Sequence, residues 1–136
     1  MKRMSNSLYE VRTGCPVETY DLTANLANRQ KAVDKYGYGP ANPSETNGQF
    51  WKGKAALFNT TVEQAQTMRC GNCAAFDISD KMRKCIANGM GKDNTSPEAV
   101  IEKADLGYCV ILHFKCAGDR TCDAWLVNGP LDNKDV

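Results

Sequence analysis

Four cysteines in the second half of the chain have a spacing suited to holding a metal centre. Cys70 and Cys73 are separated by two residues, whereas Cys85 and Cys109 stand alone farther along the chain. A close pair of thiols can ligate adjacent corners of an iron–sulfur cube from one turn of backbone, and the other corners must be reached from elsewhere in the fold. The spacing therefore predicts a [4Fe-4S] cluster bound by Cys70, Cys73, Cys85 and Cys109.

Zinc is the main alternative cofactor, because four thiolates also form a closed structural zinc site. Zinc ribbons usually present two close cysteine pairs, and this sequence has one such pair, Cys70 and Cys73. A single Cys-x-x-Cys pair also fits a redox dithiol. The two distant cysteines favour iron and sulfur, and a zinc-stabilised interaction domain stays open as an alternative.

Three further cysteines, Cys15, Cys116 and Cys122, have no place in this predicted site. In a reducing compartment, cysteine enrichment indicates metal binding more than disulfides. Cys116 and Cys122 flank a predicted turn, so they are candidates for a disulfide under oxidising conditions. Cys15 has no local partner, and its pairing with Cys116 or Cys122 stays open.

The composition limits the classes of partner. The chain of 136 residues is large enough for one small core, and its formal net charge is +1 with Lys and Arg spread along it. We therefore expect no binding to nucleic acid. No apolar run is long enough to cross a membrane, and polar Glu10, Arg12 and Thr13 follow the basic N-terminus where a signal peptide would be apolar. We expect a protein made in the cytoplasm.

The sequence offers no recognisable catalytic constellation. His113 is the single histidine, and no Ser or Asp forms a convincing triad with it. We find no Gly-rich phosphate loop and no pair of carboxylates with interpretable spacing. We expect that the protein is not an enzyme.

Caps and hydrophobic periodicity predict a small, loop-rich α+β fold, with short helices and a C-terminal β-hairpin around the metal cluster. Alternation from Gly107 to Cys116 predicts one strand, and 122–127 a second, joined by a turn at 117–121. A turn-rich stretch at 36–43 divides an N-terminal arm and helix (1–45) from a cluster-binding domain (46–136). Helices are expected near 23–36, 48–58, 60–70, 77–89 and 96–104.

The motif Cys-x-Asn-Cys-Ala-x-Phe at 70–76, followed by Cys85 and by Gly-Tyr-Cys at 107–109, resembles the high-potential iron–sulfur proteins. In that family four cysteines bind one [4Fe-4S] cluster inside an apolar shell, and the protein transfers single electrons. The resemblance implies Cys70, Cys73, Cys85 and Cys109 as ligands. Tyr108 replaces the usual Trp, the gap before Cys109 is longer, and the family's signal peptide is missing. These departures favour a structural cluster over an electron carrier.

Other segments are similar to small proteins encoded by tailed bacteriophages, particularly marine and cyanobacterial ones. This resemblance implies a virion component of a tail, neck or baseplate, made in the host cytoplasm. Its partners would be other virion proteins or further copies of itself, and the cluster would brace a small core. The alternatives are a cytoplasmic one-electron carrier of the high-potential type and a zinc domain with four cysteine ligands. The segments are 28–33, 38–43, 50–51, 69–77 and 122–125.

Overall fold

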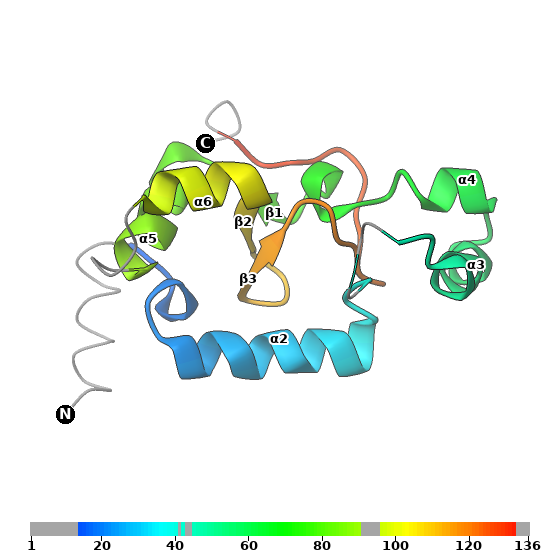
Figure 1. The fold of residues 1–136 in the computed structure, drawn as a ribbon, viewed down its shortest axis with the longest axis horizontal. Helices are drawn as coiled ribbons and strands as arrows, with labels where there is room; N and C mark the ends of the chain where they lie inside the picture. Colours follow the sequence, from blue (N-terminus) through cyan, green and yellow to red (C-terminus); the bar gives the residue numbers. More distant parts are fainter. Residues whose placement is uncertain (1–13, 41, 43–44, 91–95, 133–136) are drawn as a thin grey trace.

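A three-stranded antiparallel sheet lies at the centre of the computed structural model, which describes residues 14–40, 42, 45–90 and 96–132 (Figure 1). Strand β2 (Leu106–Cys109) occupies the middle of the sheet. It pairs with β3 (Phe114–Ala117) in a hairpin and with the short β1 (Phe76–Asp77) on its other side. Together with the helices, this sheet confirms the mixed helix and strand class.

Helices lie around the sheet (Figure 1). Helix α2 (Leu22–Tyr36) runs beside β3, and α5 (Asp80–Met90) packs against α6 (Pro97–Ala104) near β2. Helices α3 (Gly48–Leu57) and α4 (Val62–Ala65) contact each other and form a lobe at the end of the molecule away from α5. Two 3-10 turns complete the elements of the described residues, η1 (Val17–Thr19) and η2 (Cys70–Asn72).

Caps explain most of the helix boundaries. The Asp21 carboxylate accepts a hydrogen bond from the Ala24 N–H at 3.2 Å, so α2 begins slightly before the predicted Thr23. Gly37 ends α2 in the left-handed conformation with φ 59°. The Ser96 cap of α6 confirms the predicted start of that helix. In place of the predicted helix over 60–70, the structure has the short helix α4, followed by non-helical chain up to η2.

The predicted C-terminal hairpin is present, but its turn falls at 110–113 and not at 117–121. The His113 N–H donates to the Cys109 carbonyl at 2.8 Å, and His113 itself adopts φ 58°, a left-handed turn conformation. The prediction of one strand from Gly107 to Cys116 was therefore wrong. The prediction of a strand at 122–127 was also wrong, since this segment contains no strand.

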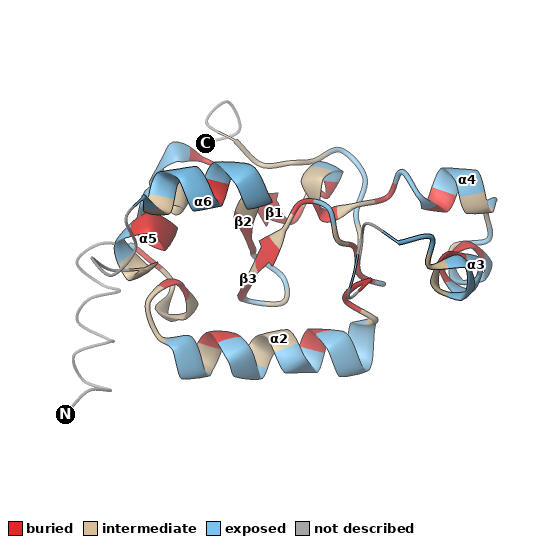
Figure 2. Cartoon of the chain, in the orientation of Figure 1, coloured by how far each residue is buried: buried red, intermediate tan, exposed pale blue. Residues whose placement is uncertain are grey.

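Buried apolar residues of the described chain form three clusters. The main cluster lies between α2, the sheet and η2, and Figure 2 shows β3 buried there beside the exposed outer surface of α2. A second cluster around Trp51 holds α3 against α4, and a third around Ile86 and Ile101 holds α5 against α6. Ala32 and Tyr38, from the predicted arm 1–45, belong to the main cluster.

Cys15 and Cys85 form a disulfide that joins the segment before η1 to helix α5. The sequence had left the pairing of Cys15 with Cys116 or Cys122 open, and the structure shows neither pairing. Both of those cysteines are free thiols. The disulfide also occupies Cys85, which was predicted to bind the cluster.

No helix within the described ranges combines the length and the apolar character needed to cross a membrane. The N-terminal segment that bears on a signal peptide, residues 1–13, lies outside the described residues.

The Cys15–Cys85 disulfide closes a loop with a sequence separation of 70 residues. Because such a cross-link restricts the unfolded chain, we expect reduction to lower the free energy of unfolding by about 4 kcal/mol. Urea unfolding with and without reductant measures this effect, and the double variant Cys15→Ser/Cys85→Ser should match the reduced protein. Alkylation of all seven cysteines in denatured, unreduced protein would contradict the disulfide.

Candidate metal centre

Five free thiols line one cavity inside the main hydrophobic cluster. Each of the five side chains is buried, and the most exposed of these residues, Cys109, retains 8% of its accessible surface. The rest of the lining is apolar or aromatic, with Tyr38 contributing the one hydroxyl-bearing side chain. The cavity therefore offers sulfur as its principal ligand chemistry. The five cysteines are Cys70, Cys73, Cys109, Cys116 and Cys122.

The η2 turn delivers Cys70 and Cys73. The Cys70 N–H donates to the Arg120 carbonyl at 2.6 Å, which ties the start of the turn to the segment after β3. The Asn72 side chain accepts from the Arg69 N–H at 3.1 Å and donates to the Thr67 carbonyl at 2.7 Å. These bonds fix both ends of the turn, so the close pair of thiols enters the cavity from one short piece of backbone.

The other three thiols come from the hairpin and the segment that follows it. Cys109 ends β2, and Cys116 lies within β3. Cys122 follows Thr121, whose backbone bridges to Gly39 and whose hydroxyl donates to the Met68 carbonyl. The hairpin turn at 110–113 matters here, because it brings β3 back along β2 and carries two more cysteines to the cavity.

Backbone N–H groups point at three of the five sulfurs. Cys73 Sγ accepts from the N–H groups of Ala75 and Leu126, both at 3.4 Å. Cys109 Sγ accepts from the Leu112 N–H at 3.3 Å, and Cys122 accepts from the backbone of Ala124. Such bonds stabilise thiolates and tune the metal that the thiolates bind. This arrangement is typical of a ligand site.

Three of the five thiols have raised pKa values. Burial raises the pKa of Cys122 to about 12, and the Ala124 N–H opposes this rise. Burial likewise raises the pKa of Cys109, against the backbone N–H groups that it accepts. The pKa of Cys116 lies well above its ordinary value, first because its thiol hydrogen-bonds to Cys70 and then because of burial. Without a bound cation, Cys109, Cys116 and Cys122 therefore favour the protonated form.

The structure brings together three of the four predicted ligands, Cys70, Cys73 and Cys109. Cys85 does not line the cavity, because it is bonded to Cys15. Two thiols that the sequence reasoning left outside the site, Cys116 and Cys122, take part in the cavity instead.

Cys122 shares a local sequence pattern with Cys73. The segment Cys73-Ala74-Ala75 and the segment Cys122-Asp123-Ala124 share the pattern Cys-x-Ala. In both segments the alanine N–H donates back to the cysteine sulfur. The pattern alone does not identify a ligand, because Cys85-Ile86-Ala87 also has it and Cys85 is bonded to Cys15.

The cavity is small, with a volume of about 10 Å³. This space is close to that of one water molecule, so the walls must move apart to admit a cubane of four irons and four sulfides. Within the described ranges, no group of three or more His, Cys, Asp or Glu side chains is arranged to hold a metal ion. The five thiols thus surround a common space without converging on a single point.

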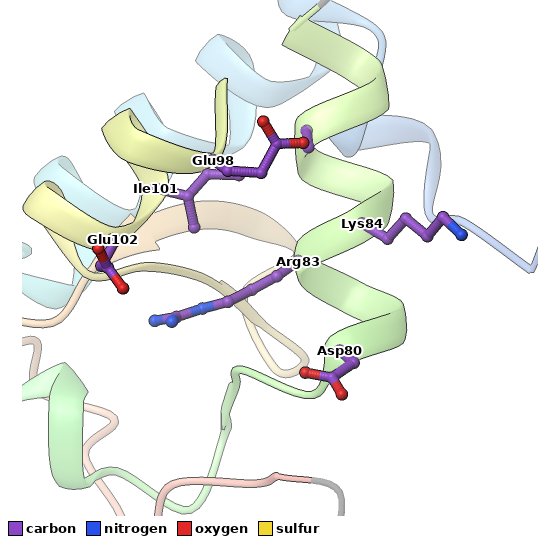
Figure 3. A pocket seen from close by; sticks show the side chains of 7 residues that line it. Asp80, Arg83, Lys84, Glu98, Ile101 and Glu102 are labelled. Atoms are coloured by element: carbon purple, nitrogen blue, oxygen red, sulfur yellow. The ribbon is translucent and has the colours of Figure 1, made fainter. Parts of the chain in front are cut away.

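A larger cavity of about 390 Å³ lies between α5 and α6 (Figure 3). Its walls mix both signs of charge, and its residue Arg83 is already engaged by the Asp105 carboxylate at 2.6 Å and the Leu106 carbonyl at 3.0 Å. Neither a thiol nor a histidine lines it. It therefore offers less distinctive chemistry than the thiol-lined cavity.

No family model matches the chain, and no match was found among curated proteins or among solved structures.

The raised pKa values of Cys116 and Cys122 predict slow alkylation of the metal-free native protein. At pH about 8.5 an ordinary thiol is about half ionised, whereas these buried thiols are protonated. We expect native Cys122 to react with iodoacetamide at least about a hundredfold more slowly than in urea. Peptide mass spectrometry over time measures both rates. Equal rates in the native and unfolded protein would contradict the burial of this thiol.

Proposed function

We propose that the protein binds a [4Fe-4S] cluster through Cys70, Cys73, Cys109 and Cys122. The observation that carries this proposal is that buried thiols from three separate parts of the chain line one apolar cavity. Cubane clusters require four thiolate ligands, and their stability benefits from low solvent access and from N–H groups directed at sulfur. The chain's own residues supply all three conditions.

Cys122 is the fourth ligand in this proposal, in place of Cys85. Two observations favour it over Cys116. Cys122 accepts a backbone N–H, as Cys73 and Cys109 do, and this interaction stabilises a thiolate. Cys116 instead hydrogen-bonds to Cys70 through its thiol, and this bond, together with burial, raises the pKa of Cys116. Cys116 then remains a protonated neighbour that donates to the sulfur of a ligand.

A single zinc ion is less well supported. Zinc draws four thiolate sulfurs to about 2.3 Å from one centre. The thiols of the described chain surround a shared space and do not converge in this way. A cluster of several irons holds its ligating sulfurs farther apart, around a shared space, and needs a wider cavity.

A bracing role for the cluster follows from the positions of its proposed ligands. Strand β1 has two residues, and β2 and β3 have four each, so the sheet supplies few backbone hydrogen bonds. The ligands would join η2, the end of β2 and the segment after β3. Metal–thiolate bonds among these segments would contribute directly to the free energy of folding.

One-electron transfer is a second candidate role, and a surface feature favours it. The side chains of Ile111 and Leu126 are 44% and 46% exposed, and the N–H of Leu126 donates to Cys73 Sγ. Val110 and Val127 are exposed apolar neighbours of these residues, and the Val110 N–H donates to the Ala75 carbonyl. A cluster in the cavity would thus lie one residue layer beneath exposed apolar side chains.

A place in a bacteriophage virion rests on the sequence resemblance and stays a prediction, as do the virion partners. The Cys15–Cys85 disulfide is compatible with it, because disulfides persist in oxidising environments. It is equally compatible with any other oxidising compartment. The proposal for the cluster does not depend on either location.

Metal analysis tests the ligand assignment. Protein purified without oxygen should contain about four irons per chain and show the broad visible absorption of thiolate-bound iron. We expect Cys122→Ser to lose most of this iron, and Cys85→Ser to retain it. Cys116→Ala should also retain its iron, because it removes a neighbouring thiol and no ligand.

The contrast between Cys122→Ser and Cys85→Ser is the decisive part of this measurement. Loss of iron in Cys85→Ser with retention in Cys122→Ser would restore the ligand set expected from sequence. Zinc in place of iron in protein from iron-supplemented, oxygen-free cultures would reject the cluster.

Removal of the metal tests the bracing role. If the cluster joins the three segments, metal-free protein should lose its cooperative thermal transition or melt at a clearly lower temperature than the loaded protein. Circular dichroism follows both transitions. Equal melting of the two forms, with reversible one-electron cycling of the loaded protein, would instead favour the electron carrier.

A further inference from the structure

Lys54 is a buried cation beside the proposed ligand Cys122. It belongs to α3, and only 4% of its surface is exposed. Its Nζ donates to the Cys122 carbonyl at 2.8 Å and lies 4.5 Å from the centre of the Phe58 ring. The lysine thus reaches from the α3–α4 lobe to the backbone of a residue that lines the thiol cavity.

A buried ammonium group normally requires a negative partner, because leaving water is costly for a charge. Within the described part of the chain, no carboxylate forms an ion pair with Lys54. Burial lowers the pKa of Lys54, and the Asp123 carboxylate, which lies against the backbone of Gly37, opposes this shift through space without forming an ion pair. A carbonyl and an aromatic ring compensate the charge only in part. The fold therefore keeps a cation at a place where the described protein supplies no counter-charge in contact.

We propose that Lys54 is the fixed counter-charge of the cluster and raises its reduction potential. This inference rests on the proposed function, because the negative charge comes from the thiolates and the cluster that they hold. One-electron reduction adds one unit of negative charge to the cluster. A nearby cation in a site of low dielectric constant stabilises this reduced state more than the oxidised state.

If Lys54 had a purely structural role, its substitution would shift the reduction potential of the cluster in the opposite direction. Lys54 also helps to attach the α3–α4 lobe, together with Arg69, which lies 4.9 Å from the Trp51 ring. If substitution merely loosened this lobe, water would gain access to the cluster. Water favours the more highly charged reduced state, so the potential would rise. Loss of a fixed cation lowers the potential, and the sign of the shift separates the two roles.

Voltammetry of the loaded, full-length protein measures this sign, with the electrode supplying the electron. We expect Lys54→Met to have a lower midpoint potential than the parent protein at equal iron content. Lys52→Met is the matched control, because Lys52 is exposed on the same helix and carries the same charge. Its potential should stay close to that of the parent. Lys54→Arg keeps the positive charge, so its midpoint potential should lie close to that of the parent protein.

An unchanged or raised potential in Lys54→Met would overturn the role of Lys54 as counter-charge. If that variant does not fold, Lys54→Gln keeps a hydrogen-bond donor without the charge, and an unchanged or raised potential in it has the same meaning. Failure of the parent protein to bind iron would reject the proposed function itself. The two failures are therefore distinguishable in one set of samples.

Discussion

Five thiols buried in a single cavity are the constraint around which the described fold is arranged. A thiol is apolar enough to pack in a hydrophobic cluster, and here the thiols pack with Phe76 and Phe114. The sulfurs of Cys73, Cys109 and Cys122 also accept backbone N–H groups. These bonds pair backbone N–H groups that lie outside the strands, so sulfur here replaces some of the acceptors that a larger sheet would provide.

This arrangement explains how irregular chain can form the walls of a core. The segments 67–75 and 118–126 are joined by backbone hydrogen bonds, although none of their residues lies in a strand. Their buried polar groups are paired by specific bonds, such as that from Thr121 to Met68 and that from the Trp125 indole to the Arg69 carbonyl at 3.0 Å. Trp125 is therefore held against the start of η2, where it packs against the main cluster.

Local signals in the sequence predicted most of the helices, with the exception of the expected helix over 60–70, and they identified the close thiol pair in η2. The Ser96-Pro97 start and the Gly37 stop act within one turn of backbone, so they can be recognised without the rest of the fold. The hairpin was misplaced because alternation from 107 to 116 is the same for one long strand as for two strands joined by a tight turn. The two strands are separated by a turn in which His113 has a positive φ, and the residue types at 110–113 do not indicate such a turn.

The assignment of Cys85 required information that no local pattern contains. Helix α5 turns Ile86 and Ala87 toward α6, which leaves Cys85 free to face another element. This element is η1, and Gly89 permits its close approach to α5, because a Cβ at position 89 would collide with the Thr19 carbonyl oxygen. Gly89 lies at the end of the helix expected over 77–89. That approach brings Cys85 to Cys15 and leaves the fourth position at the thiol cavity to a cysteine from the segment after β3.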